Sequence, residues 1–257
     1  MNIYVCVKHV PDTAVNIKVA GENDFESKGC RFVVNPYDEY AIEEAITIVK
    51  NAGQGEVIIV TIGAGGAIAS VRSALAMGAH RGILVKNDNY FLDSATIALA
   101  LKKAIENDGP ADLIFMGKAS VDSEGLQTQY RLASAFNIPV ANEVNAMTLG
   151  NGKVVVEREI EGGNRQVIEM KTPCVIGTTR GLNEPRYPKL PDILKAKKKE
   201  VKEMDISELG ISVEGPVAEL VKLENVKERT AAKIIDGDVQ DAVRNLVRIL
   251  KEEEKVI

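Results

Sequence analysis

The sequence contains no tryptophan, and aromatic residues make up only 4% of its 257 residues. A core must therefore be built from Ala, Val, Ile and Leu, which suits a parallel sheet covered by helices. Histidine is also scarce, since His9 and His80 are the only two. Neither lies beside the clustered ligands of a zinc site or a G-x-S-x-G nucleophile motif. We therefore predict no metal and no catalytic residue in this chain.

Cysteines are few and widely separated: Cys6, Cys30 and Cys174. This spacing argues against a disulfide framework, and we expect buried free thiols in a reducing compartment. No run reaches the ~18 consecutive apolar residues of a membrane span. The N-terminus, "MNIYVCVKHV", is typical of a strand and not of a signal peptide. We expect a cytoplasmic protein without membrane insertion.

The charge balance gives no global positive field. Asp and Glu number 37 against 32 Lys and Arg, a formal net charge of -5, which excludes general attraction to nucleic acid. Positive charge is instead concentrated behind one stiff loop, in residues 182–200, "LNEPRYPKLPDILKAKKKE". Its role must be local.

Apolar β-branched runs alternate with helical patterns through the first half of the chain. The predicted strands are 3–10, 56–63, 81–87 and 112–118, and the predicted helices are 37–52, 67–79, 93–107 and 123–136. This alternation predicts an α/β fold with a doubly wound, mostly parallel, Rossmann-like sheet.

The second half has a different texture. Residues 153–171, "KVVVEREIEGGNRQVIEMK", have the pattern of an antiparallel hairpin that extends the sheet, and 173–181 predicts another strand. Residues 201–237 show no clear period, whereas 238–254 predict an amphipathic helix capped by Asp238. We therefore predict an α/β domain over 1–181, a partner-recognition segment over 182–200, and an arm and helix over 201–257 that dock on a partner.

Two glycine-rich stretches fail as phosphate motifs. "TIGAGGAIAS" has Ile68 at the third glycine position of G-x-G-x-x-G, and "GKAS" lacks the first glycine and the Ser/Thr of a P-loop. What remains is position: "NPYD" (35–38) and "GKASVDSEGLQT" (117–128) lie where strand ends meet helix starts, and an adenine nucleotide fits such an edge. The residues alone favour N-capping of a helix near 123 by Asp122 and Ser123.

Several blocks of the chain resemble the β subunit of electron transfer flavoproteins. They are "VKHVPD", "NPYDEYAIEEA", "ALAMGAHRGILV", "LIFMGKASVD", "VEREIEGG", "LNEPRYPKLPDILKAKKK" and "ERTAAK". The resemblance implies a heterodimer with a larger α subunit, which holds most of a shared FAD, and electron transfer from flavin dehydrogenases of the acyl-CoA dehydrogenase type. It also implies AMP in this chain's cleft.

The resemblance assigns the nucleotide site residue by residue. The implied positions are Cys6, Asn35, Pro36, Tyr37, Asp38, Ile62, Gly117, Ser120, Val121, Asp122, Ser123, Gly125, Leu126, Gln127 and Thr128. Leu126 stands where AMP-binding members have a polar residue. This leaves open an electron-bifurcating form, in which a second FAD occupies the same cleft and NAD(H) and ferredoxin take part.

The resemblance also gives the loop a role. Leu190, between Tyr187 and Pro191, matches the leucine that inserts into an apolar pocket of the partner dehydrogenase. The prolines restrict the free loop and so reduce the ordering entropy lost on docking. We read Lys195, Lys197, Lys198 and Lys199 as a cluster that speeds encounter with an acidic partner.

Glu159 matches a glutamate that steadies the mobile flavin domain. A free-standing adenine-nucleotide module of the stress-protein kind is a third reading, but it leaves the loop unexplained.

Overall fold

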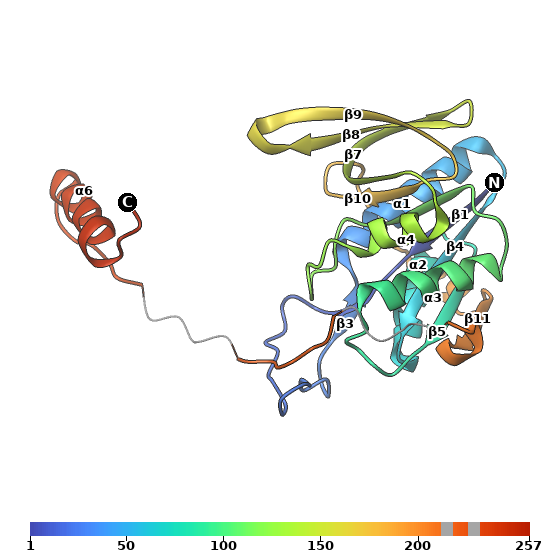
Figure 1. Ribbon diagram of the computed structural model, residues 1–257, viewed down its shortest axis with the longest axis horizontal. Helices are drawn as coiled ribbons and strands as arrows, with labels where there is room; N and C mark the ends of the chain where they lie inside the picture. Colours follow the sequence, from blue (N-terminus) through green and yellow to red (C-terminus); the bar gives the residue numbers. More distant parts are fainter. Residues whose placement is uncertain (212–217, 226–231) are drawn as a thin grey trace. The chain divides into compact units, whose positions relative to one another are not determined.

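The computed structural model describes residues 1–211, 218–225 and 232–257 (Figure 1). They form two units, Met1–Leu223 and Glu224–Ile257. The division falls after residues 182–200 and well inside the predicted arm, 201–257.

The larger unit is built on a nine-stranded sheet with the order β11-β5-β4-β1-β6-β10-β7-β8-β9. The strands from β11 to β7 pair in parallel, and β7, β8 and β9 pair antiparallel. This confirms the predicted doubly wound, mostly parallel α/β fold. The strands are β1 (Asn2–Cys6), β4 (Glu56–Gly63), β5 (Arg81–Lys86), β6 (Leu113–Gly117), β7 (Val140–Gly150), β8 (Lys153–Ile160), β9 (Asn164–Lys171), β10 (Val175–Thr178) and β11 (Val201–Asp205).

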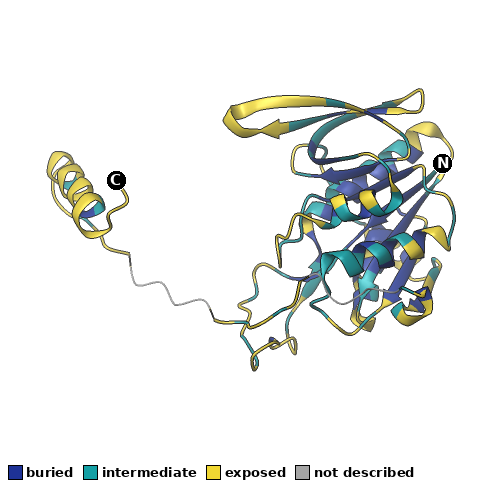
Figure 2. Ribbon diagram, viewed as in Figure 1, coloured by how far each residue is buried: buried dark blue, intermediate teal, exposed yellow. Residues whose placement is uncertain are grey.

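Helices cover both faces of the parallel sheet, as in a three-layer fold. Helices α1 (Pro36–Ala52) and α2 (Ile68–Met77) share one buried cluster with Val5, Ile59 and Phe115. Helices α3 (Ser94–Glu106) and α4 (Thr128–Phe136) share a second with Tyr4 and Ile114. The central strands β1, β4, β5, β6 and β10 are buried on both sides (Figure 2), since successive residues of a strand point to opposite faces and helices cover each face.

The predicted hairpin is confirmed. Strands β8 and β9 pair antiparallel from Lys153↔Lys171 to Ile160↔Asn164, joined by the short helix η2 (Glu161–Gly163). Much of this hairpin is exposed (Figure 2). Strand β7, to which β8 pairs, is not among the sequence predictions.

The first predicted strand, 3–10, is wrong in its length. Strand β1 ends at Cys6, and β2 (His9–Pro11) pairs antiparallel with β3 (Phe32–Val34) in a separate two-stranded sheet. The apolar run continues through both strands, so hydrophobicity alone does not mark the point at which the chain leaves the main sheet.

The fourth helix begins five residues later than predicted, at Thr128 instead of 123. Glu124 and Leu126 adopt positive φ angles of 46° and 53°, which no α-helix contains. The predicted capping by Asp122 and Ser123 is therefore wrong, and these residues belong to a loop that precedes the helix.

Two further segments are more regular than predicted. Leu190–Ala196, expected as part of a stiff loop, forms the short helix α5, which has proline in its first turn. Val201–Asp205, expected to lack regular structure, forms strand β11 beside β5 and is followed by the short helix η3 (Ile206–Leu209). Its charged residues are compatible with an edge strand, which is half open to water.

The smaller unit contains the predicted C-terminal helix, α6 (Val239–Arg248), continued by the π-helical turn η4 (Ile249–Glu253). The predicted cap is confirmed, since the Asp238 carboxylate accepts hydrogen bonds from the backbone N–H groups of Gln240 and Asp241. Over the described ranges, none of the helices has both the length and the hydrophobicity of a transmembrane span.

Candidate functional site

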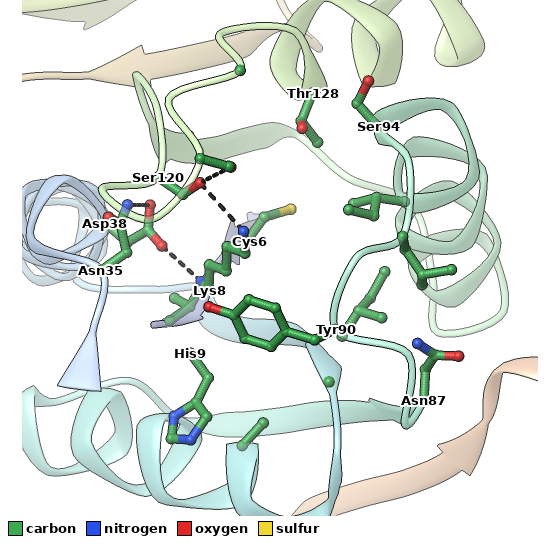
Figure 3. Close-up of a pocket in the computed structure, with 18 of the residues that line it drawn as sticks. Cys6, Lys8, His9, Asn35, Asp38, Asn87, Tyr90, Ser94, Ser120 and Thr128 are labelled. Carbon is green, nitrogen blue, oxygen red and sulfur yellow. Dashed lines mark hydrogen bonds between the residues drawn. The ribbon is translucent and has the colours of Figure 1, made fainter. Parts of the chain in front are cut away.

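A cavity of about 810 Å³ opens at the carboxyl ends of β1, β4 and β6 (Figure 3). Strand β1 lies between β4 and β6 in the sheet. The chain crosses from β1 to β4 and β5 on one side and later returns to β6 on the other side of β1, so the cavity lies where the winding of the sheet reverses. Ligands of open α/β sheets bind at such switch points. The volume falls within the ~300–1,000 Å³ typical of cofactor sites.

Asp38 joins three elements at the floor of this cavity. Its Oδ2 accepts from the Lys8 backbone N–H at 2.7 Å, and its Oδ1 accepts from the Gly117 N–H at 2.8 Å and from Asn35 Nδ2 at 2.9 Å. Asp38 as a whole is only 4% exposed. Burial raises the pKa of Asp38 to about 7, although the N–H donors act in the opposite direction.

Asn35 fixes the loop that follows β6. Its Nδ2 also donates to the Ala119 carbonyl at 2.9 Å, and its Oδ1 accepts from the Val121 N–H at 3.1 Å. Gly117 permits this approach, because a Cβ there would lie 2.4 Å from Asp38 Oδ1. The "NPYD" segment and the 117–128 loop are therefore held together by side-chain hydrogen bonds, although about 80 residues separate them in the chain.

Lys8 and Asp122 form an ion pair at the cavity wall. Lys8 Nζ lies 2.7 Å from Asp122 Oδ2, and the Tyr90 hydroxyl donates to the same oxygen at 2.7 Å. Burial alone would raise the pKa of Asp122, but Lys8, Ser120 and Tyr90 hold it below its usual value. In Figure 3, Lys8 lies between Ser120 and the Tyr90 ring. The carboxylate is thus ionised and fully engaged with the protein.

Helix N-termini supply positive potential to the cavity. Ser94 of α3 and Thr128 of α4 line it from neighbouring helices (Figure 3), and the glycine-containing turn η1 (Gly65–Ala67) enters α2 at its edge. The Asp93 carboxylate caps α3, because it accepts from the backbone N–H groups of Ala95 and Thr96. The starts of α4 and of the Gly65–Ala67 turn have no side-chain cap, so their N–H groups favour an anionic ligand. The arrangement suits a phosphate-bearing molecule.

Eleven of the fifteen residues assigned by resemblance line the cavity: Cys6, Asn35, Asp38, Ile62, Gly117, Ser120, Ser123, Gly125, Leu126, Gln127 and Thr128. Pro36, Tyr37, Val121 and Asp122 are not among the lining residues. Pro36 and Tyr37 begin α1, while Val121 and Asp122 make the loop contacts described above. Ligand contact by these residues stays a prediction.

The sequence reasoning missed an aromatic wall. Tyr90 packs edge-on against Phe25 and Phe91, each with ring centroids 5.1 Å apart, and His9 stacks on Phe32 at 4.7 Å. Burial lowers the pKa of His9, and its Nδ1 lies 2.8 Å from Ser70 Oγ. Phe25, Tyr90 and Phe91 come from irregular segments, and His9 and Phe32 from the short strands β2 and β3, so only the rarity of such rings in this chain could have drawn attention to them.

All three cysteines are free, with Cys6 and Cys174 buried and Cys30 partly buried. Within the described part of the chain, no group of three or more His, Cys, Asp or Glu side chains is arranged to hold a metal ion.

Comparison with known proteins identifies the family. The electron transfer flavoprotein domain matches residues 25–209. The chain is 34% identical over 258 residues to the electron transfer flavoprotein subunit beta of Bradyrhizobium diazoefficiens, and 33% identical over 261 residues to that of Bacillus subtilis, with 100% of each chain covered in both comparisons. It is 34% identical over 252 residues to the same subunit of Mus musculus, covering 96% of each chain.

The chain belongs to the electron transfer flavoprotein β-subunit family. Membership of this family places the chain in flavoprotein electron transport.

In this electron transfer flavoprotein β chain, residues 182–200, here called the recognition segment, expose their apolar residues. Tyr187 is 95% exposed and Leu190 is 69% exposed, and both Ile193 and Leu194 of α5 are also exposed. Pro191 occupies the first turn of α5. An apolar group of this kind on a surface is typical of a docking site.

The lysines that follow are not alike. The side chain of Lys195 is 75% exposed, and Lys198 is also exposed, as the predicted cluster requires. Lys199 differs, because its Nζ donates to the Leu75 carbonyl at 2.9 Å and to the Ala79 carbonyl at 2.5 Å, at the carboxyl end of α2. The prediction that Lys199 belongs to the lysine cluster that speeds encounter with a partner is therefore wrong. Its charge instead interacts with the carbonyl groups at the carboxyl end of α2.

Glu159 lies on β8, exposed and in register with Arg165 of β9. The nearest ion pair on this hairpin joins Arg165 to Glu157, at 3.4 Å. The Glu159 carboxylate therefore faces solvent on the hairpin, and its role with a flavin domain stays a prediction.

Proposed function

We propose that this chain is the β subunit of a heterodimeric electron transfer flavoprotein that carries electrons from a flavin dehydrogenase of the acyl-CoA dehydrogenase type to a downstream acceptor. It would pair with a larger α subunit, help to hold the FAD bound mostly by that subunit, and bind an adenine nucleotide itself. The observation that carries the proposal is one cavity at a sheet switch point, lined by most residues of the implied nucleotide site.

The residues present fit an adenine nucleotide. Ser94 and Thr128 at two helix starts, together with the Gly65–Ala67 turn, offer backbone and hydroxyl donors for phosphate oxygens. Lys8 lines the cavity as one half of the ion pair with Asp122, and its Nζ lies 5.7 Å from the centroid of the Tyr90 ring, which adds an aromatic surface beside it. The chain's own part is to bind and orient the nucleotide and to keep water from it.

When bound, FAD supplies the exchange of one or two electrons, which no side chain of this protein provides. The role of the chain would be to position the nucleotide. Asp38 and Asn35 hold the walls of the proposed nucleotide site together through hydrogen bonds to each other, to Gly117 and to Val121. Glu159 on the exposed hairpin would pair weakly with the flavin-bearing partner, since an exposed ion pair contributes under about 1 kcal/mol. Weak pairing permits release and switching.

A second FAD in the same cavity is the alternative. Leu126 lines the cavity and is 47% exposed, which gives an apolar surface where AMP-binding members have a polar one. The volume of about 810 Å³ leaves room for more than a mononucleotide. In that case the heterodimer would be an electron-bifurcating enzyme that links NAD(H) and ferredoxin to the dehydrogenase.

Leu190 would anchor the partner dehydrogenase. Burying one leucine contributes roughly 1.5–3 kcal/mol, which is enough to orient an encounter and small enough to allow release. Lys195 and Lys198 beside it would attract an acidic rim on that enzyme and accelerate association.

The deciding experiment is co-expression with an α subunit of the family, followed by extraction and identification of the bound nucleotides. One FAD and one AMP per heterodimer support the main proposal, and two FAD with NADH-driven reduction of ferredoxin support the alternative. A chain that carries no flavin colour and does not associate with the α subunit would refute both the main proposal and the alternative.

A further inference from the structure

The recognition segment is fastened to α1 at its start. Arg186 makes three bonds to the Glu43 carboxylate: its backbone N–H donates to Oε2 at 3.1 Å, its Nε to Oε2 at 2.7 Å, and its Nη2 to Oε1 at 2.6 Å. Asn183 adds bonds to the Tyr40 carbonyl at 3.0 Å and to Glu44 Oε2 at 2.9 Å. All of these partners lie on one helix, so the segment starts from a fixed surface.

The Glu43–Arg186 pair is sheltered. Glu43 is only 8% exposed, and the Arg186 side chain is 40% exposed. Burial would raise the pKa of Glu43, but the hydrogen bonds from Arg186 keep it below its usual value, so both groups are charged at neutral pH. A planar guanidinium that donates two parallel bonds to a carboxylate fixes direction as well as distance, which a lysine cannot do.

The far end of the segment is fastened to α2. Arg72 Nη1 donates to the Ala196 carbonyl at 2.8 Å and to the Lys199 carbonyl at 2.6 Å. Ala196 is the only residue of α5 that is buried. The exposed residues from Tyr187 to Leu194 therefore lie between two anchored ends, with little burial of their own.

We propose that Glu43 and Arg186 are positioning residues for partner docking: they hold the recognition segment in the geometry that presents Leu190 and Tyr187 to the dehydrogenase. This inference rests on the proposed function of the segment. A docking segment that is already ordered loses less conformational entropy on binding than one that must be ordered at that moment. Neither residue needs to contact the partner, because the effect acts through the fraction of molecules that are ready to bind.

The test measures electron transfer from a dehydrogenase to the α/β heterodimer. Short-, medium- and long-chain acyl-CoA dehydrogenases, each with its acyl-CoA, are screened to find the enzyme that reduces the wild-type heterodimer fastest. Arg186→Gln and Glu43→Gln are expected to raise the KM for the heterodimer about fivefold to tenfold, with kcat unchanged. The double variant should raise KM no more than either single variant does, because both substitutions remove the same interaction.

Conservative and control variants separate positioning from general stability. Arg186→Lys keeps the charge but loses the two parallel bonds, so its KM should lie between those of the wild type and Arg186→Gln. Lys86→Gln is the matched control, since it removes an exposed pair with Glu203 at 3.2 Å and should leave KM unchanged. Hydrogen exchange of the backbone amides of Tyr187, Lys189, Leu190 and residues 192–194 should be faster in Arg186→Gln and unaltered in Lys86→Gln.

Leu190→Ala distinguishes failure of the inference from failure of the function on which it rests. If Leu190→Ala raises KM while the Arg186 and Glu43 variants do not, the positioning role is wrong and the docking role stands. If no variant in the segment changes KM, the docking role is refuted, and the inference with it. If KM rises without any change in amide exchange, Arg186 acts by direct contact, which overturns positioning.

Discussion

Replacement of Asp38 by asparagine is the sharpest test of how the cavity is built. The carboxylate accepts the backbone N–H of Lys8 on one oxygen and that of Gly117 on the other, at 2.7 and 2.8 Å. An amide of the same shape has only one accepting oxygen, so in either orientation one buried backbone donor loses its acceptor. Such a loss costs about 1–3 kcal/mol.

The assay is thermal denaturation of the heterodimer at a fixed nucleotide concentration, together with the nucleotide content after purification. The melting point should fall by about 2–4 °C for each kcal/mol lost in a chain of this size. Bound nucleotide should also decrease, because either Gly117 in the 117–121 loop or Lys8 at the cavity wall loses its hydrogen bond to residue 38. Asp112→Asn is the control: its carboxylate accepts the Asn2 N–H at 2.7 Å at an exposed position, where water replaces it, and the change should stay within about 0.5 kcal/mol.

The pH dependence of this loss follows from the same burial. Because the pKa of Asp38 is raised from 3.8 to about 7, the native state binds more protons than the unfolded state in that interval, and this group's stabilisation falls as pH rises through it. Asp38→Asn lacks the titration, so the gap between wild type and variant should be wider at pH 5 than at pH 8. A variant as stable as the wild type at both pH values, with full nucleotide content, would refute the reasoning.

Three further predictions concern neighbouring features. Gly117→Ala should destabilise the heterodimer by about 1–3 kcal/mol and reduce bound nucleotide, because the new Cβ would overlap Asp38; unchanged melting would contradict this. Leu190→Ala should slow reduction by the dehydrogenase and leave bound nucleotide unchanged; loss of the nucleotide instead would show that the segment has been misread. Raising the salt concentration should lower the association rate in stopped-flow measurements, and Lys195→Gln with Lys198→Gln should remove most of that dependence; a rate insensitive to salt would discard steering.

The layered fold could be predicted from periodicity, because a doubly wound sheet repeats its pattern for every strand and helix. The errors lie where a local exception overrides that pattern. The positive φ of Glu124 and Leu126 delays α4, and neither residue type signals such a conformation. Strand β11 reads as irregular because an edge strand carries charged side chains.

The candidate site was predicted unevenly for a similar reason. Residues at strand ends, such as Asn35 and Asp38, follow from topology and resemblance, since their position in the fold is fixed by the strand before them. Tyr90 and Phe25 reach the cavity from long connections, and only tertiary packing brings them together. The sequence pattern alone does not indicate that Tyr90 and Phe25 come into contact.

The different settings of the lysines have a practical consequence for mapping the docking surface with amine-reactive cross-linkers. Lys199 presents its amine to two carbonyls, and burial lowers its pKa, whereas Lys195 and Lys198 extend into water. Cross-links from the latter two would report distances to a bound dehydrogenase. A cross-link from Lys199 would instead report that the carboxyl end of α2 had opened, so one reagent would record both docking and local unfolding on the same stretch of chain.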